Sequence, residues 1–193
     1  MKIGILAIQG DFELHRKMLS RLNVDTVLVK SPADLEKCDG LIIPGGESTT
    51  FIKLLKVSGL FAAVKQFSQA KAIMGTCAGL ITLARKVTNF SLETLDLIDL
   101  DVARNAYGRQ IDSFIGEVAL HINGRDTSFE GVFIRAPRIE KTGQGIRSLA
   151  FYQGDVVLAE NENILVATFH PELTEDTRIH EYFIRKIQAK IQS

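Results

Sequence analysis

The sequence predicts an α/β fold in which a mostly parallel central sheet carries helices on both faces. In the first half of the chain, short apolar segments rich in β-branched residues alternate with amphipathic helical segments, as in βαβ units. These strand-like segments are apolar throughout, which is typical of strands buried on both faces. In the second half, strand-like segments follow one another closely, which predicts an antiparallel extension of the sheet. We expect the 193 residues to form a single domain, 1–193.

The overall charge argues against an anionic partner. The chain has 23 Lys and Arg residues and 23 Asp and Glu residues without a basic cluster, so we expect no nucleic acid and no membrane as partner. The apolar segment Met1–Ile8 is too short for a signal peptide and is interpreted as the first strand, and no segment reaches the roughly 18 apolar residues of a membrane helix. Cys38 and Cys77 alone make no disulfide scaffold, and we expect a reducing, cytoplasmic location.

Local signals predict the next elements. Asp11 is expected to cap a helix after the first strand. A second strand is predicted at Thr26–Val29, a turn at Ser31–Asp34, and a third strand at Asp39–Pro44, which ends at a proline and two glycines. The apolar face of the helix is expected to consist of Leu14, Met18, Leu19 and Leu22.

The second half is predicted to contain strands, hairpins and a final helix. Asn161–Asn163 is expected to form a hairpin turn, and Thr177–Ile191 an amphipathic helix. Residues 88–100 show no clear pattern and receive no assignment. The predicted strands are Val118–Ile122, Gly131–Ile134, Ser148–Tyr152, Val156–Ala159 and Ile164–Phe169.

The chain around Cys77 has the pattern of a nucleophile elbow. An apolar run, Ala72–Met74, leads into Gly75-Thr-Cys-Ala-Gly79, and apolar residues at helical spacing follow, which predicts strand, tight turn and helix. We expect the Cys77 side chain to point into solvent at a helix N-terminus, where the thiolate is favoured. On this pattern alone, a small buried hydrophobic residue explains Cys77 equally well.

The glycine loop Pro44–Thr50 follows the third strand. Because ligands gather at the carboxyl ends of parallel strands, we expect this loop and the elbow to meet. By itself, Gly45-Gly46 is explained by a strand-to-helix turn with Ser48 as N-cap. The loop lacks the lysine of a P-loop, and no G-x-G-x-x-G follows the first strand, which argues against nucleotide binding. Beside a nucleophile, the N–H groups of Gly45, Gly46 and Ala78 would form an oxyanion hole.

Of the four histidines, His170 is the candidate base. His15 and His180 lie on predicted helices and His121 lies in a predicted strand, so we interpret these three as structural or exposed. His170 stands at the end of a strand with Glu172 two residues later. In an extended chain such residues share a side, so the carboxylate would orient one imidazole nitrogen and leave the other for a nucleophile.

Polar loops carry three arginines that could recognise a carboxylate. Each of Arg104, Arg109 and Arg135 is, taken singly, typical of a solvated loop charge. A site that must hold a carboxylate would use a guanidinium group in this way.

These motifs resemble those of the class I glutamine amidotransferases, in which a Cys elbow is combined with an H-P-E motif. Three further segments resemble one branch, the glutaminase subunits of pyridoxal 5′-phosphate synthase. The resemblance spans nearly the whole chain and implies a flavodoxin-like three-layer class I glutamine amidotransferase fold. Small departures occur at Met74, where an aromatic residue is common, and at Ala103, where an acidic residue is common. The matching segments are Pro44–Thr50, Gly75–Gly79, Ala103–Gln110, Phe133–Pro137 and Phe169–Asp176.

The resemblance also implies an activity. Cys77 would be the nucleophile, His170 the base and then the acid, and Glu172 its orienting partner. L-glutamine would be hydrolysed to L-glutamate and ammonia without a metal or cofactor, and the ammonia would pass to a separate, barrel-shaped synthase subunit. The residues implied to hold glutamine are Gly46, Glu47, Ser48, Arg104, Ile134 and Arg135.

Two other functions are considered. One is a glutaminase of another pathway, such as histidine biosynthesis, or a cysteine hydrolase of the same build, and the branch-specific arginine segments argue against it. The other is a non-catalytic binding or regulatory module, which predicts a broken triad. Cys77, His170 and Glu172 are all present, so the sequence favours the enzyme.

Overall fold

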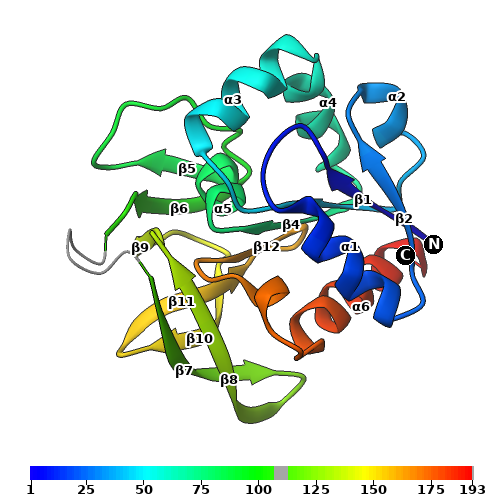
Figure 1. Ribbon diagram of the computed structural model, residues 1–193. Helices are drawn as coiled ribbons and strands as arrows, with labels where there is room; N and C mark the ends of the chain where they lie inside the picture. Colours follow the sequence, from blue (N-terminus) through cyan, green and yellow to red (C-terminus); the bar gives the residue numbers. More distant parts are fainter. Residues whose placement is uncertain (107–112, 193) are drawn as a thin grey trace.

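The computed structural model describes residues 1–106 and 113–192 (Figure 1). The first half of the chain forms β1 (Lys2–Leu6), α1 (Phe12–Arg21), β2 (Asp25–Val29), α2 (Pro32–Leu35), β3 (Gly40–Ile43), α3 (Ser48–Val57), α4 (Leu60–Phe67), β4 (Ala72–Thr76) and α5 (Ala78–Leu83). The second half forms β5 (Ala84–Val87), β6 (Ile98–Ala103), β7 (Ser113–Ile122), β8 (Arg125–Ile134), β9 (Arg138–Thr142), β10 (Arg147–Tyr152), β11 (Asp155–Glu160), β12 (Ile164–Ala167), the 3₁₀ helix η1 (Pro171–Leu173) and α6 (Arg178–Gln192).

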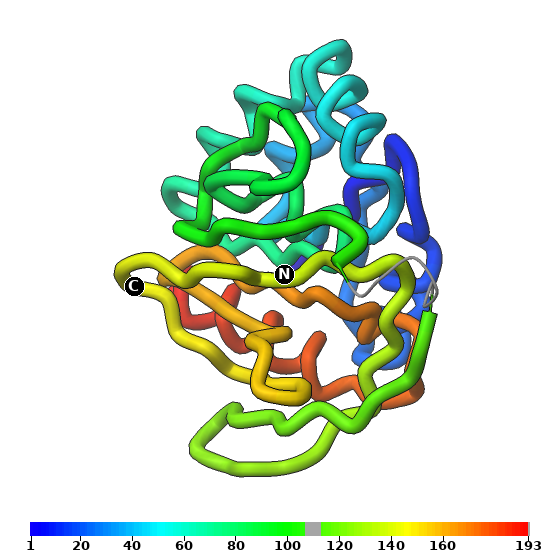
Figure 2. Tube along the Cα trace, turned by 90° about the vertical axis from the view of Figure 1, so that its left-hand side faces the viewer, coloured from blue at the N-terminus to red at the C-terminus, as the bar shows by residue number. Residues whose placement is uncertain are grey.

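The central sheet has a parallel half and an antiparallel half. Within the described residues, its strand order is β2-β1-β3-β4-β12-β11-β10-β7-β8. The strands β2, β1, β3, β4 and β12 pair in parallel, and the pairs from β12 through β11, β10 and β7 to β8 are antiparallel. The parallel half has the flavodoxin-like order 2-1-3-4-5. Figure 2 shows the hairpin of β7 and β8 at the edge far from the N-terminal helices and strands. The predicted fold class is confirmed.

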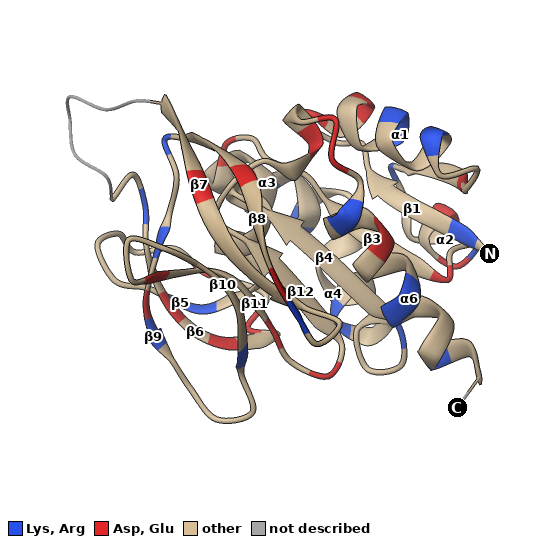
Figure 3. Ribbon diagram, turned by 90° about the horizontal axis from the view of Figure 1, so that it is seen from below, with Lys and Arg blue, Asp and Glu red and all other residues tan. Residues whose placement is uncertain are grey.

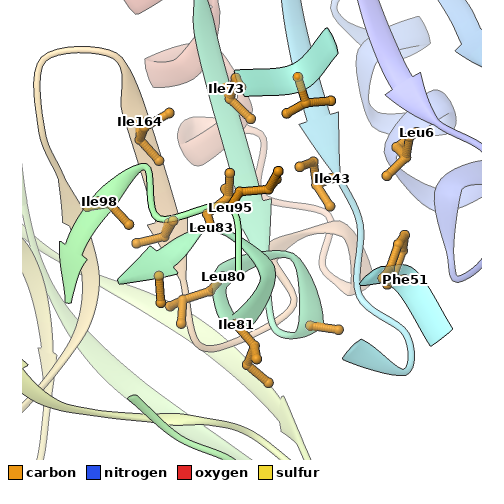
Figure 4. Close-up of a cluster of buried hydrophobic side chains, with 14 of the residues drawn as sticks. Leu6, Ile43, Phe51, Ile73, Leu80, Ile81, Leu83, Leu95, Ile98 and Ile164 are labelled. Carbon is orange, nitrogen blue, oxygen red and sulfur yellow. The ribbon is translucent and has the colours of Figure 1, made fainter. Parts of the chain in front are cut away.

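Alternating side chains fill a separate core on each face of the parallel strands. In β4, Ala72 and Met74 pack on the side of α1 and α6, whereas Ile73 packs on the side of α2 to α5. Figure 4 shows the second core, in which Leu80, Ile81 and Leu83 of α5 lie between residues of β4, β6 and α3. Fully burying one such aliphatic side chain contributes about 1.5–3 kcal/mol, so α5 is anchored firmly below the elbow.

A second, smaller sheet was not predicted from the sequence, and of its strands only the start of β6 lies in residues 88–100, which received no assignment. Its strands β5, β6 and β9 are ordered as β5-β6-β9, with β5 and β6 parallel and β6 and β9 antiparallel. In β5, Arg85 and Lys86 are exposed and only the two ends are buried. The strand β9 has the mixed sequence RIEKT with one buried residue. Such short, largely exposed strands carry little hydrophobic pattern, which explains why they were not predicted.

Of two local predictions about the starts of helices, one was wrong and the other was confirmed in position only. Ser31–Asp34 was predicted as a turn, but it starts the short helix α2, because Ser31 and Asp34 form a capping box around Pro32. Asp11 precedes α1 as expected, yet its side chain makes no capping hydrogen bond. The predicted final helix is confirmed as α6, whose buried face contains Ile179, Phe183 and Ile187.

Basic and acidic residues are mixed along the chain. Figure 3 shows Lys and Arg interspersed with Asp and Glu along the helices and strands of that view, in keeping with equal numbers of the two signs. Among the described helices, none is both long and apolar enough to cross a membrane.

Candidate active site

The elbow around Cys77 has the predicted strand–turn–helix form. β4 ends at Thr76, Cys77 has φ 50° and ψ −104°, and α5 begins at Ala78. A positive φ is unfavourable for a residue with a side chain and costs about 1–3 kcal/mol, so the surroundings hold Cys77 in this conformation. Gly79 permits the turn, since a Cβ there would lie 2.1 Å from the carbonyl oxygen of Ile43 in β3.

Cys77 is more buried than expected. The sequence predicted a side chain pointing into solvent, whereas Cys77 is 7% exposed. Its Sγ lies 3.8 Å from the carbonyl oxygen of Ile134, and Cys77 and His170 line the same pocket. The difference arises because the end of β8 covers the elbow, a long-range contact that the local motif does not contain.

His170 and Glu172 are in direct contact, as predicted, although the local geometry differs. His170 Nδ1 lies 2.8 Å from Glu172 Oε1, and both residues are almost fully buried. The sequence predicted an extended chain at this point, but Pro171–Leu173 forms the 3₁₀ helix η1. The proline after His170 starts this turn, and the turn folds the carboxylate back to the imidazole.

The electrostatics of the pair favour a charged imidazole and a charged carboxylate. Burial disfavours the imidazolium, but the contacts with Cys77 and Glu172 outweigh burial and raise the pKa of His170 to about 10. Burial likewise opposes ionisation of Glu172, yet His15 and His170 hold its pKa well below the usual range. Nδ1 of His170 is engaged by Glu172, so Nε2 is the nitrogen left for the thiol of Cys77, which lines the same pocket.

Gly45 allows the glycine loop to lie directly against the imidazole. A Cβ at this position would lie 2.4 Å from Cε1 of His170. The loop is held from the other side, because Asp11 donates its backbone N–H to the carbonyl oxygen of Gly45 at 3.2 Å. The predicted meeting of the glycine loop and the elbow is therefore observed.

One pocket gathers most of the predicted site residues. Gly45 and Glu172 do not line it: Gly45 packs on His170, and Glu172 lies buried behind the imidazole. Asp11, Ile81 and Asn105 line the pocket without having been predicted. The predicted residues that line it are Gly46, Glu47, Ser48, Cys77, Ala78, Arg104, Ile134, Arg135 and His170.

Glu47, rather than Ser48, is the N-cap of α3. Its carboxylate accepts hydrogen bonds from the backbone N–H groups of Thr49 and Thr50. Burial alone would raise the pKa of Glu47, but the hydrogen bonds from these two threonines lower it to about 2. The N-cap prediction for Ser48 was wrong because the longer side chain one residue earlier reaches the same N–H groups. Ser48 is 2% exposed, and its Oγ has no hydrogen-bond partner among the described residues.

The arginines of the pocket differ in their partners. Arg104 donates to Glu47 Oε1 at 3.0 Å, and its guanidinium group lies 4.7 Å from the centre of the Phe90 ring. Arg135 is exposed, has a left-handed φ of 42°, and makes no ion pair within the part of the chain that the structure describes. Arg109 was also considered from the sequence, and it lies outside the described residues.

Two buried histidines next to Glu172 were not recognised as part of the site. His15 Nε2 lies 3.5 Å from Glu172 Oε2, and His15 Nδ1 lies 3.0 Å from His180 Nε2. Helical spacing contained a signal: His15, Met18 and Leu19 share the buried face of α1, and His180 shares the buried face of α6 with Phe183. No group of three or more His, Cys, Asp or Glu side chains in residues 1–106 and 113–192 is arranged to hold a metal ion.

Comparisons with known proteins agree over almost the full length. The model of the SNO glutamine amidotransferase family matches residues 5–189. The pyridoxal 5′-phosphate synthase subunit PdxT of Thermosipho africanus is 48% identical over 189 residues, covering 97% of this chain and 100% of that protein. The same subunit of Thermotoga maritima is 47% identical with the same coverage. A crystal structure of a glutamine amidotransferase matches with a TM-score of 0.91 and 40% identity, covering 96% of this chain and 98% of that one.

Proposed function

The chain belongs to the SNO glutamine amidotransferase family, and from this premise we propose that it hydrolyses L-glutamine and delivers the ammonia to a separate pyridoxal 5′-phosphate synthase subunit. The observation that carries the proposal is that Cys77 and His170 line one pocket and that Glu172 contacts His170 from behind at 2.8 Å. A thiol facing an imidazole that is oriented by a carboxylate is suited to nucleophilic attack on an amide.

Cys77 is the proposed nucleophile. When the proton lies on His170, the sulfur is a thiolate, which is the reactive form. Sγ attacks the side-chain amide carbon of glutamine, so that a C–S bond forms and the carbonyl electron pair moves onto oxygen. When the C–N bond breaks, His170 gives its proton to the departing nitrogen. Ammonia leaves, and a thioester remains on Cys77.

The negative oxygen of this intermediate needs hydrogen-bond donors. The proposed donors are the backbone N–H of Ala78, the first residue of α5, and those of Gly45 and Gly46. Ala78 and Gly46 both line the pocket, and the glycine loop lies directly against His170. One such donor contributes about 3 kcal/mol of transition-state stabilisation.

Water then hydrolyses the thioester. His170, which is neutral after ammonia has left, takes a proton from water as the oxygen attacks the thioester carbon. The C–S bond breaks, L-glutamate is released, and Cys77 returns to the thiolate. Throughout the cycle, Glu172 keeps the Nδ1 proton on its own side of the imidazole, so that Nε2 faces the reacting atoms.

The rim of the pocket is proposed to hold the rest of glutamine. Arg135 has an unpaired guanidinium group among the described residues and is assigned to the α-carboxylate. Ser48 offers an unpartnered, buried hydroxyl. Arg104 donates a hydrogen bond to Glu47, so the two side chains together form a polar side of the pocket. Gly46 and Ile134 complete the binding surface.

The names of the curated relatives supply the pathway. They are subunits of pyridoxal 5′-phosphate synthase. We assign the same role to this chain: it provides ammonia for vitamin B6 biosynthesis to a barrel-shaped synthase subunit, and the complex of the two works in the cytoplasm.

Glutamate release from L-glutamine tests the proposal. The purified chain is assayed alone and with the synthase subunit, and Cys77→Ala is compared with the matched variant Cys38→Ala. Cys38 is a buried core residue whose Sγ donates to the carbonyl oxygen of Asp34, away from the pocket. We expect synthase-dependent release that Cys77→Ala lowers by at least about 10³-fold and Cys38→Ala retains.

Each alternative gives a different result in the same assay. Turnover by Cys77→Ala would reject Cys77 as the nucleophile. Release that does not depend on the synthase subunit would keep the glutaminase and assign it to another partner. No release under either condition would favour a non-catalytic module.

A further inference from the structure

His15 lies directly behind the proposed catalytic carboxylate. It is fully buried on α1, and its Nε2 lies 3.5 Å from Glu172 Oε2 and 3.2 Å from the hydroxyl of Thr76. Its Nδ1 lies 3.0 Å from Nε2 of His180 on α6. The helices α1 and α6 come from opposite ends of the chain and lie side by side on one face of the sheet (Figure 1). Their two histidines thus continue the line from Cys77 through His170 and Glu172.

The position of each proton follows from what the nitrogens of His180 face. Burial, followed by the neighbouring His15, lowers the pKa of His180 to about 3, so this imidazole is neutral and carries one proton. Its Nδ1 is buried and has no hydrogen-bond partner among the described residues. A buried N–H without an acceptor is strongly disfavoured, so the proton of His180 belongs on Nε2, which donates to His15 Nδ1. With Nδ1 as the acceptor, His15 carries its proton on Nε2, which faces Glu172 and Thr76.

Glu172 needs a donor on this side. Its Oε1 is engaged by His170, whereas Oε2 is buried and makes no hydrogen bond of ordinary length in the described part of the chain. Its ion-pair partners there are His15 and His170, and no Lys or Arg is among them. Leaving an oxygen of a buried carboxylate without a donor costs free energy, and His15 Nε2 is the donor positioned to prevent it.

We propose that His15 is a positioning residue for the glutaminase reaction: its Nε2 proton, directed by His180, holds the Oε2 side of Glu172 so that Oε1 stays aligned with His170. The inference rests on the proposed function, because His15 does not line the pocket and acts only through Glu172 and His170. The terminal torsion of a glutamate is broad, so a carboxylate held on one side only would rotate away from His170 for part of the time. His170 would then lose the tautomer that presents Nε2 to Cys77.

Two substitutions at His15 test this role against a matched control. His15→Leu removes the donor, whereas His15→Gln keeps an N–H donor near the position of Nε2. His121→Gln is the control, because His121 also pairs with a carboxylate, that of Asp126 at 2.6 Å, but is exposed on β7. With the synthase subunit present, we expect His15→Leu to lower kcat by about 10- to 100-fold, the value of a hydrogen bond to a charged group. KM for glutamine changes little, His15→Gln restores part of kcat, and His121→Gln behaves as wild type.

Coupling to Glu172 separates positioning from a general effect on folding. In a Glu172→Gln background the carboxylate is gone, so adding His15→Leu is expected to lower kcat little further. A second readout is alkylation of Cys77 by iodoacetamide as a function of pH, in a Cys38→Ala background. When His15→Leu loosens Glu172, the imidazolium that supports the thiolate is weakened. The midpoint of alkylation is then expected to move to higher pH, by about one unit for a tenfold effect.

The possible results distinguish this inference from the proposed function. Unchanged kcat together with an unchanged alkylation profile in His15→Leu would overturn the role of His15, as would an equal loss of kcat with and without Glu172. If wild type releases no glutamate with the synthase subunit, the proposed function fails, and the alkylation profiles alone still decide whether His15 positions Glu172. Should His15→Leu not fold, His15→Gln and His180→Phe replace it, and His180→Phe is expected to shift the profile in the same direction by a smaller amount.

Discussion

The two buried glutamates of the described structure are held in opposite ways. Glu160, at the end of β11, is 3% exposed, and its carboxylate contacts Arg147, Tyr182 and Lys186. Glu172, in η1, is 4% exposed, and its ion-pair partners among the described residues are the imidazoles of His15 and His170. Burial opposes ionisation of both, and the partners outweigh it, so the pKa of each carboxyl is lowered.

The difference lies in whether the partners can change their charge. Glu160 raises the pKa of Arg147 and also accepts a hydrogen bond from Lys186, so these contacts join α6 and β10 to β11 and move no proton in the proposed reaction. His170 must gain and lose a proton in every proposed reaction cycle, and Glu172 adjusts to both states. A buried carboxylate held by fixed cations therefore supports the fold, whereas one held by imidazoles can support chemistry.

The same substitution at the two glutamates gives the largest expected contrast. Glu172→Gln puts an amide beside Nδ1 of His170 and allows the tautomer that carries its proton on Nε2, which is the wrong one for deprotonating Cys77. We expect kcat for glutamine hydrolysis to fall by about 10³-fold or more while the fold is retained. Glutamate release with the synthase subunit measures kcat, and circular dichroism measures whether the fold is retained. An activity close to wild type would contradict the role of Glu172.

Glu160→Gln is expected to lower the stability of the fold and to leave kcat unchanged. It leaves Lys186, whose side chain is 13% exposed, without its countercharge. Breaking a buried ion pair from one side costs about 3–5 kcal/mol, so we expect a clear loss of unfolding free energy and unchanged kcat. The chain contains no Trp, and urea unfolding is best followed by circular dichroism. A loss of kcat without a loss of stability would show that the Glu160 cluster also serves the reaction.

The proposed catalytic centre was largely predictable because its signals are local. The glycines around Cys77 and the short spacing from His170 to Glu172 are visible in a few consecutive residues. The parallel half of the sheet was predictable for a related reason, since apolar strands such as β3 and β4 are buried on both faces. The direction of the Cys77 side chain was not predictable from the sequence, because it depends on a contact with the end of β8.

The surroundings of the centre depend on long-range contacts and were missed. His15 and His180 are 165 positions apart and meet only because α1 and α6 cover the same face of the sheet. The sheet of β5, β6 and β9 combines short strands with exposed polar residues, which leave no periodic pattern. Glu47 lines the pocket, and its role as the N-cap of α3 was not predicted, because both Glu47 and Ser48 carry a side-chain oxygen and only the folded geometry shows which one reaches the N–H groups.

The alkaline pH dependence of stability offers a subtler contrast between the two glutamates. The pKa of His170 is raised to about 10, above the ordinary value of 6.5. A raised pKa stabilises the fold fully below about 6.5, and this contribution is lost as the pH rises towards 10. Glu172→Gln removes one cause of the raised pKa, so we expect a flatter decline of unfolding free energy between pH 7 and 10, which urea titrations measure. Glu160→Gln should keep the wild-type slope, and equal slopes in the two variants would contradict the assignment.

The comparison extends to the cations of the pocket, where the smallest effect is expected. Arg104 is engaged by Glu47, much as Arg147 is engaged by Glu160, whereas Arg135 has no ion-pair partner among the described residues. A guanidinium group that the protein leaves unpaired at a pocket is available to a substrate carboxylate. We therefore expect Arg135→Ala to raise KM for glutamine about 10-fold with little change in kcat, because the contact is the same in ground and transition states. Arg125→Ala, at the other end of β8, is the control. An unchanged KM would return Arg135 to the role of a solvated loop charge.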